Sequence, residues 1–442
     1  MTTTGVAVLD RLSADIGDTF FENALPYFTA TSDGEADGTT IVATGLKDVF
    51  RADDTATGWV RMRSGAAAGQ IRAIPNTSSF TYTSGTLTVA AFIAQIVSGA
   101  TFEIHRVHPA IKIGKINQAI EELYPTLYLP VRDETLIVDS WLENGGLEAG
   151  ATNVFTGWTK TDTWTETALF TLSGARAALS GGTGSILYQD VTSLVNASPA
   201  PNSVIPLKEI IGRTVKVRAG CYGTVTTPTI RVSWGAGGSD FVASDAHSGE
   251  LGWEFLEAET VIPTTADFVR IELRPGAANV AFDHASLIVQ GVPRYRYTVP
   301  VSIIDGPTHI EMQADADKPE GPYYPVTARN RPVEGRMLRL QGRGYLSTFA
   351  TDSTFDAATT EVDSQRLNML TNKAAALMAE TGQARRLFSE AAEIDWEGKA
   401  NDLKRRPGVR MVPMSAQMPD EGVWHLERDS SNKYIVFERN HG

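Results

Sequence analysis

The chain has 442 residues, of which 42% are hydrophobic and 21% are charged, and this composition predicts a globular protein of two or three domains. Its formal net charge of -13 argues against a protein that coats nucleic acid without sequence preference. The single cysteine, Cys221, excludes an internal disulfide and a cysteine-based zinc site.

The start of the chain gives no sign of export or membrane insertion. The segment MTTTGVAVLDRLSAD lacks the basic patch and apolar core of a signal peptide. No apolar run approaches the roughly 20 residues that a membrane-spanning helix needs. We therefore expect a soluble protein that is made in the cytoplasm.

The period of the apolar residues changes along the first part of the chain. Residues 5–26 carry them at helical spacing and predict one or two short helices. Residues 29–107 form short apolar runs between turn residues and predict a small antiparallel β-barrel. Residues 110–124 predict the clearest helix of this part, with isoleucines three and four apart, Pro109 at its start and Pro125 directly after it.

Residues 136–290 predict a complete β-domain inserted into this host. Short runs rich in Val, Ile, Thr and aromatic residues, such as TVKVRAGCYG and TIRVSWGAG, end at Gly, Pro, Asn or Asp. This pattern is typical of an antiparallel sandwich, here of the jelly-roll kind. A jelly roll brings its two ends together at one edge, so a host domain tolerates its insertion.

The host resumes near residue 294 with further strands and continues with a helix predicted over residues 360–396. An apolar seam along that helix suits packing on another helix, for which residues 110–124 are the natural partner. We also expect the seam to drive self-association through Leu367, Leu370, Leu377 and Phe388. The last segment, 399–442, predicts an extended arm with a terminal hairpin. Its basic residues are candidates for contact with a partner protein or with DNA phosphates: Lys399, Lys404, Arg405, Arg406 and Arg410.

The predicted fold class is therefore multidomain α+β. A discontinuous host domain, residues 1–135 and 291–398, combines the small antiparallel β-barrel with a helix pair. It carries the inserted β-sandwich at residues 136–290, and the arm follows at residues 399–442.

Five motifs of the sandwich segment have a familiar order: NGGLEAG, Gly157-Trp158, LYQDVTSL, GWEFLEAETVIPTTADFVRIELRP and AFDHASL. In this order and spacing they resemble the carbohydrate-binding modules with a jelly-roll fold. Aromatic rings stack on sugar rings, for which the segment offers Trp158, Trp164, Tyr188, Trp234 and Trp253. The family pattern implies that Trp158 and Trp253 lie in the core, which leaves Trp164 and Trp234 as the candidates for glycan stacking.

The same resemblance implies a structural calcium ion. The family holds this ion with the glutamate of the first motif and the first aspartate of the last, which are Glu148 and Asp283 here. Carboxylate oxygens suit calcium. However, His284 replaces the second aspartate of the family pattern, which weakens the expected site.

Outside the sandwich, another set of segments resembles the neck proteins of tailed bacteriophages, the head-to-tail connectors or adaptors. These segments are DGTTIVATGLKDVF, SGATFEIHRVHPAIKIGKINQAIEELYP and GRMLRLQGRGYLS, followed by the late helix and the basic arm. The resemblance implies a virion protein that forms a homo-oligomeric ring, usually of twelve copies, between the portal protein and the tail proteins. DNA would pass through the ring, and the jelly roll would face outward.

No catalytic motif is found in the sequence: G-x-S-x-G, H-E-x-x-H and the phosphate-binding Gly-Lys-Ser/Thr loop are all missing. The cluster of Glu254, Glu257 and Glu259 lies in WEFLEAETV, a predicted strand in which alternate side chains face solvent, and this favours surface charge over an acid/base pair. His105 and His108 lie three residues apart without an evident third metal ligand. We therefore predict no enzyme activity, and no cofactor other than the calcium ion.

Two functions remain open at this point. The first is a neck ring that joins the portal to the tail. The second is a tail-associated protein whose jelly roll binds a cell-surface glycan or another receptor. The helix pair and the basic arm favour the first hypothesis, because a free sugar-binding protein would not need them.

Overall fold

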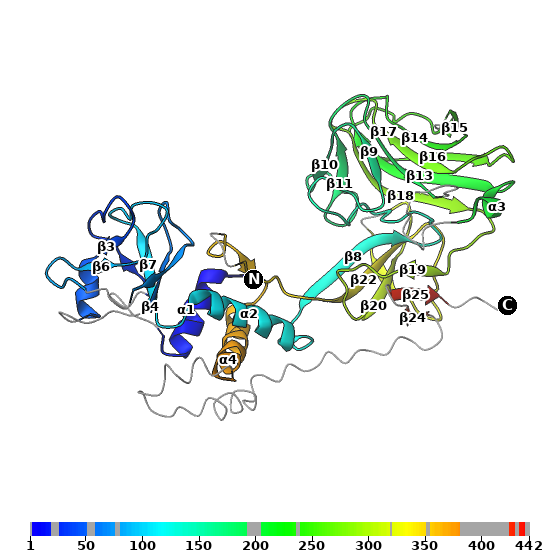
Figure 1. Ribbon diagram of the computed structural model, residues 1–442. Helices are drawn as coiled ribbons and strands as arrows, with labels where there is room; N and C mark the ends of the chain where they lie inside the picture. The colour runs from blue at the N-terminus through cyan, green and yellow to red at the C-terminus, as the bar shows by residue number, and fades with distance from the viewer. Residues whose placement is uncertain are drawn as a thin grey trace. The chain divides into compact units, whose positions relative to one another are not determined.

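The computed structural model describes residues 2–18, 26–50, 58–75, 80–191, 205–235, 239–318, 321–350, 354–380, 424–428 and 433–437. The chain folds into two compact units (Figure 1). Unit 1 comprises Met1–Leu129 and Tyr345–Pro413, and unit 2 comprises Pro130–Gly344 and Met414–Gly442. Among the described helices, none is long and apolar enough to cross a membrane.

The β-sheet part of unit 1 consists of two antiparallel sheets around one apolar core. The larger sheet has the order β2-β7-β4-β5, and the smaller one pairs β3 with β6. Their bounds are β2 Phe28–Thr29, β3 Thr40–Val42, β4 Gly58–Met62, β5 Ile71–Ile74, β6 Thr86–Thr88 and β7 Thr101–His105, with a short 3-10 helix at Thr44–Asp48. The sequence predicted these strands as one barrel. In the described residues they pair as two separate sheets, although both contribute to the same core.

Three helices form the helical part of unit 1: α1 Gly5–Asp15, α2 Pro109–Leu123 and α4 Ser364–Glu380. They lie against one another in Figure 1, and their apolar residues share one core, which we call the helical core. The backbone N–H of Ala110 donates to Nδ1 of His108 at 3.1 Å, which caps α2. The short strands β1 Thr3–Thr4 and β23 Thr359–Thr360 pair beside the helices.

The expected helix pair is thus joined by a third helix. Helices α2 and α4 do pack together as predicted, but α1 also contributes to the helical core through residues such as Leu9 and Leu12. The late helix was predicted over residues 360–396. The structure describes it over Ser364–Glu380, and residues 381–396 lie outside the described residues.

Two five-stranded antiparallel sheets form the jelly roll of unit 2 (Figure 1). Their orders are β10-β11-β18-β13-β16 and β15-β14-β17-β12-β9, and their inward residues make the largest core of the chain. The strands are β9 Thr159–Thr161, β10 Trp164–Thr167, β11 Ala177–Ser180, β12 Ile186–Asp190, β13 Thr214–Gly223, β14 Thr229–Trp234, β15 Asp240–Ala243, β16 Gly252–Val261, β17 Arg270–Arg274 and β18 Ala281–Val289, with helix α3 at Leu207–Ile210.

Two smaller sheets complete unit 2, with the orders β21-β20-β22-β8 and β19-β25-β24. Their strands are β8 Leu129–Ile137, β19 Arg296–Thr298, β20 His309–Gln313, β21 Tyr323–Pro325, β22 Met337–Gly344, β24 Trp424–Arg428 and β25 Lys433–Phe437. Both sheets share one core. The predicted terminal hairpin exists as β24 and β25, but it is built into this unit by pairing with β19.

The boundaries of the two compact units therefore differ from the domain boundaries expected from the sequence. Strand β8 continues past residue 135, so Leu136 and Val138 belong to the core of the small sheets and not to the jelly roll. At the other end of the insertion, Arg294 is buried and its guanidinium donates to the carbonyl oxygens of Ser140 at 2.7 Å and Leu142 at 3.2 Å. The jelly roll and the small sheets consequently form one compact unit, while the host strands before and after it divide between the two units.

The apolar seam of α4 is used inside the chain. Leu370 is 0% exposed and Leu377 is 4% exposed, both in the helical core, and Leu367 packs partly buried against it. These three residues therefore do not form the self-association surface that the sequence analysis expected. The fourth, Phe388, lies outside the described residues.

We predict that Leu370→Asp unfolds unit 1. The substitution buries an unpaired charge and empties the space of a leucine, which together cost more than about 3 kcal/mol. Amide exchange on peptides from α2, measured at increasing temperature, will show the loss of stability of unit 1. Asn368→Asp, at an exposed position of the same helix, is the matched control and should leave exchange unchanged. Normal protection of α2 in Leu370→Asp would show that the seam is not part of this core.

Candidate functional site

One face of the jelly roll carries charged and aromatic side chains in rows. It is the outer face of the sheet β15-β14-β17-β12-β9, because Leu187, Ile230 and Ile271 of these strands point inward and are fully buried. Successive side chains of a strand point to opposite faces, so their neighbours point outward. We call this surface the arginine face, and it consists of Tyr188, Asp190, Arg231, Ser233, Phe241, Arg270, Glu272 and Arg274.

The strand register places seven of these residues in two rows across the sheet, and Arg274 lies opposite Thr229 beside them. In one row, Glu272 lies directly between Arg231 on β14 and Tyr188 on β12. The other row runs through Phe241, Ser233, Arg270 and Asp190. Four strands thus bring together residues that are far apart in the sequence.

Glu272 is at the centre of the face and is 4% exposed. Its Oε1 accepts a hydrogen bond from the hydroxyl of Ser233 at 2.8 Å, and its Oε2 accepts from Nε of Arg274 at 2.7 Å. A buried carboxylate is tolerated only with such partners. Each oxygen of Glu272 therefore already has a donor.

Arg270 is held by a carboxylate and by an aromatic ring. Its Nε and Nη2 donate to the two oxygens of Asp190, at 2.6 and 3.0 Å. Its guanidinium carbon lies 3.9 Å from the centre of the Tyr188 ring. The bidentate bond and the cation–π contact together fix the plane of this guanidinium.

Arg231 is arranged differently. Its guanidinium carbon lies 4.0 Å from the centre of the Phe241 ring, and its buried Nε has no hydrogen-bond partner. Burial and the nearby Arg274 lower the pKa of Arg231, whereas Glu272 raises it. Among the described residues, no ion pair joins Arg231 to a carboxylate.

The five aromatic residues selected from the sequence lie in different parts of the jelly roll. The prediction for Trp164 is wrong, because its side chain is 1% exposed and lies in the sandwich core, 6.2 Å from the ring of Phe282. Trp234 is partly buried and packs against the same core. Trp158 is buried as expected. Trp253 lies on the other sheet against Tyr222, so only Tyr188 of the five aromatic residues belongs to the arginine face.

The expected calcium ligands lie in one region of unit 2. Both carboxylates already accept backbone N–H groups: Glu148 from Ala175 at 2.9 Å, and Asp283 from Leu172 at 2.9 Å. Burial is the main cause that raises the pKa of Glu148 to about 7, and burial also raises the pKa of Asp283. The described residues contain no group of three or more His, Cys, Asp or Glu side chains placed to hold a metal. The calcium ion stays a prediction, and it would need carbonyl oxygens as further ligands.

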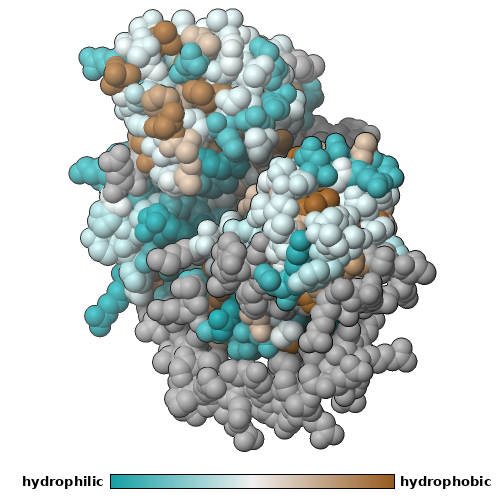
Figure 2. Space-filling model, turned by 90° about the vertical axis from the view of Figure 1, so that its left-hand side faces the viewer, coloured by the Kyte–Doolittle hydropathy of each residue, from teal (hydrophilic) through white to brown (hydrophobic). Residues whose placement is uncertain are grey.

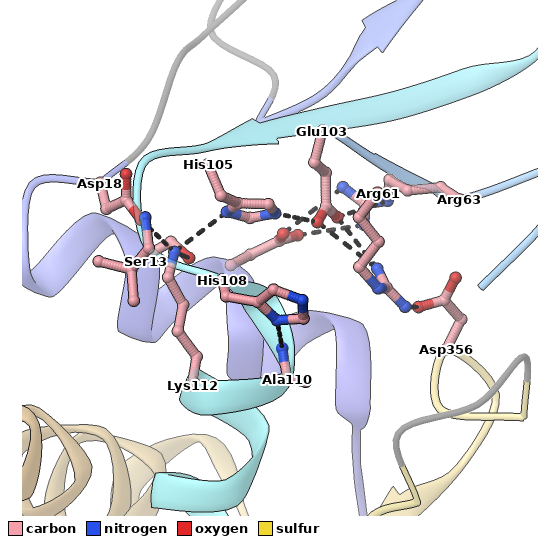
Figure 3. Close-up of polar contacts among 12 residues, drawn as sticks. Ser13, Asp18, Arg61, Arg63, Glu103, His105, His108, Ala110, Lys112 and Asp356 are labelled. Atoms are coloured by element: carbon pink, nitrogen blue, oxygen red, sulfur yellow. Dashed lines mark hydrogen bonds and ion pairs between the residues drawn. The ribbon is translucent and has the colours of Figure 1, made fainter. Parts of the chain in front are cut away.

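A second cluster of charges is buried in unit 1 (Figure 3). Its centre is Lys112 of α2, which is 0% exposed. The Lys112 ammonium donates to Asp18 at 2.7 Å, to Ser13 at 2.8 Å and to Nδ1 of His105 at 3.0 Å. These three bonds use all of its protons, so a lysine that would be costly to bury is satisfied.

The cluster continues from His105 into the sheet. Because Nδ1 of His105 accepts from Lys112, its Nε2 carries the proton and donates to Glu103 at 2.8 Å. Glu103 also contacts Arg61 at 3.5 Å and Arg63 at 3.2 Å. Arg61 in turn pairs with Asp356, and Arg63 pairs with Asp10 of α1. This buried ionic network connects the larger sheet of unit 1 to its helices.

The other sequence candidates take structural positions. His105 belongs to the buried network and His108 caps α2, so neither is placed as a metal ligand. Glu257 forms ion pairs with Lys216 at 2.9 Å and Arg218 at 3.1 Å, in agreement with the surface-charge interpretation. The five basic residues of the arm lie outside the described residues: Lys399, Lys404, Arg405, Arg406 and Arg410.

Comparison with known proteins gives likenesses of structure alone. No family model matches the chain, and no curated protein matches it. The CBM22-1 xylan-binding domain of Paenibacillus barcinonensis Xyn10C is similar at 15% identity and a TM-score of 0.23, over 36% of this chain and 94% of that one. A family 22 carbohydrate-binding module of Clostridium thermocellum Xyn10B gives 14% identity and a TM-score of 0.23, over 34% and 98%. Tailspike protein 4 of bacteriophage CBA120 gives 13% identity and a TM-score of 0.24, over 34% of this chain and 21% of that one.

We predict that unit 1 loses stability through His105 as the pH falls below about 6.5. Burial is the main cause that lowers the pKa of His105 in the folded chain, and the charge of Lys112 lowers it further. The unfolded chain therefore takes up the proton first, so stability falls with falling pH in this window. Asp10 acts in the opposite sense, because burial raises its pKa to about 6. The difference between wild type and His105→Gln therefore isolates the histidine.

Glutamine offers a donor and an acceptor but binds no proton. The stability of unit 1 in the variant should therefore depend less steeply on pH between pH 7 and 5. Amide exchange on α2 peptides, corrected for the intrinsic effect of pH, measures it. His425→Gln, at a half-exposed position of β24, is the control. Equal slopes for wild type and His105→Gln would contradict the arrangement of protons described above.

Proposed function

We propose that the jelly roll binds a glycan on the arginine face, and that the chain does so as a tail-associated protein of a bacteriophage particle. The observation that carries the proposal is the arrangement of the face itself. Tyr188 and Phe241 supply aromatic surface on two strands, and fixed polar groups lie between them. Sugar recognition combines these features, since rings stack on aromatic residues and hydroxyls need donors and acceptors held in place.

The proposed activity is binding without cleavage. Cleavage of a glycosidic bond usually requires two carboxyl groups, of which one donates a proton. The two carboxylates of the face, Asp190 and Glu272, are both engaged in ion pairs with arginines. This arrangement favours a fixed hydrogen-bonding surface over proton transfer.

The virion assignment rests on the resemblance of the host segments to phage connector proteins. The finer hypothesis, a neck ring of about twelve copies between the portal and the tail, stays a prediction from that resemblance. The seam that was expected to build the ring, with Leu370 and Leu377, is buried within the chain. On the surface that Figure 2 draws, the apolar residues form scattered spots between polar ones. We therefore place the glycan-binding hypothesis first.

The proposal predicts that Tyr188→Ala weakens glycan binding about fivefold, because it removes an aromatic contact worth roughly 1 kcal/mol. A glycan array carrying xylan, β-1,4-galactan and bacterial surface polysaccharides will identify the glycans that the full chain binds. Affinity electrophoresis will then compare the variants on those glycans.

Tyr222→Ala is the matched control, because Tyr222 lies on the other sheet, stacked at 4.8 Å on Phe170. It should leave the affinity unchanged. The proposal fails if the wild-type chain binds nothing on the array. It also fails if the loss follows Tyr222 and not Tyr188.

A further inference from the structure

The three arginines of the arginine face are not equally satisfied. Arg270 is paired with Asp190 and Arg274 is paired with Glu272. Arg231 has an aromatic ring beside it, but its Nε lacks a hydrogen-bond partner. It is also not in an ion pair with any described carboxylate.

Glu272 does not supply the partner that Arg231 lacks. It lies next to Arg231 in the strand register and favours the charged form of the arginine. However, its oxygens already accept from Ser233 and Arg274. The face thus holds three guanidinium groups against two carboxylates, a surplus of one positive charge on a chain whose formal net charge is -13.

The contact with Phe241 adds orientation to this charge. A guanidinium that stacks on a ring keeps its plane parallel to it and points its N–H donors sideways, in the fork that matches a carboxylate. An arginine held in this way loses little side-chain freedom on binding. Arg231 is therefore prepared for a planar anionic group.

From these observations we propose that the arginine face selects acidic glycans, in which a carboxylate on a sugar ring binds Arg231 while the ring lies beside Tyr188 or Phe241. The inference rests on the proposed glycan-binding function and adds the class of sugar. The carboxylate gives the Arg231 guanidinium the ion-pair partner that it lacks among the described residues and neutralises the surplus charge, whereas a neutral sugar does neither.

The test uses matched pairs of glycans. Polygalacturonate, alginate, hyaluronan and polysialic acid are each presented beside their carboxyl-reduced forms, and binding of the full chain is measured at low and high salt. We expect at least one acidic glycan to bind about tenfold more tightly than its reduced form, with a preference that weakens as salt increases.

Arg231→Gln should abolish this preference and leave the weaker binding of neutral glycans in place. Arg213→Gln removes the same charge from an exposed position elsewhere on the jelly roll and should change nothing. Circular dichroism will verify that both variants are folded. If glycans bind but no acidic one is preferred, or if the preference survives in Arg231→Gln, the inference is wrong and the glycan-binding function stands. If no glycan binds at all, both fail.

Discussion

Strand β18 is buried along its whole length, and the arrangement of the rest of unit 2 depends on the burial of both sides of this strand. One side of the strand faces the sandwich core, where Phe282 and Leu287 lie. On the other side the small sheets and their loops cover the jelly roll: the guanidinium of Arg218 reaches Asp317, and the hydroxyl of Ser173 contacts Sδ of Met337 at 3.5 Å. The outer face of this sheet is thus covered within the chain along β18. The opposite sheet carries the arginines, aromatic rings and carboxylates of the arginine face, where we propose that a ligand binds.

The two units satisfy buried charges in contrasting ways. In unit 1, Lys112, His105 and Glu103 satisfy one another, and the chain of bonds ends at partners that are themselves paired. Such a network fixes the sheet against the helices. On the arginine face the pairing is incomplete at one position, Arg231. This difference supports the proposal that unit 2 binds a ligand on the arginine face.

The sequence predicted much of the fold and little of the site. Period-two runs with turn residues between them located the strands of the jelly roll, and the isoleucine spacing located α2, with its bounds within one residue. Trp164 shows where such reasoning ends, because alternation along a short strand does not say which of its two faces turns inward. The arginine face was missed for a related reason. Arg231, Glu272 and Tyr188 lie on three strands that are separated by about 40 residues or more in the sequence, and only the register brings them into one row. The packing of α4 on α2 was predicted, but the sequence did not show that α1 joins the same core, in which Leu370 and Leu377 are buried.

The structure of the full chain with a bound oligosaccharide, chosen as the glycan that it binds most tightly, tests the central claim most directly. The account predicts that the sugar lies on the sheet β15-β14-β17-β12-β9, with a carboxylate within about 3 Å of the Arg231 guanidinium and a ring against Tyr188 or Phe241. A sugar bound elsewhere, for example beside Trp253 on the other sheet, with the arginine face unchanged, would contradict it.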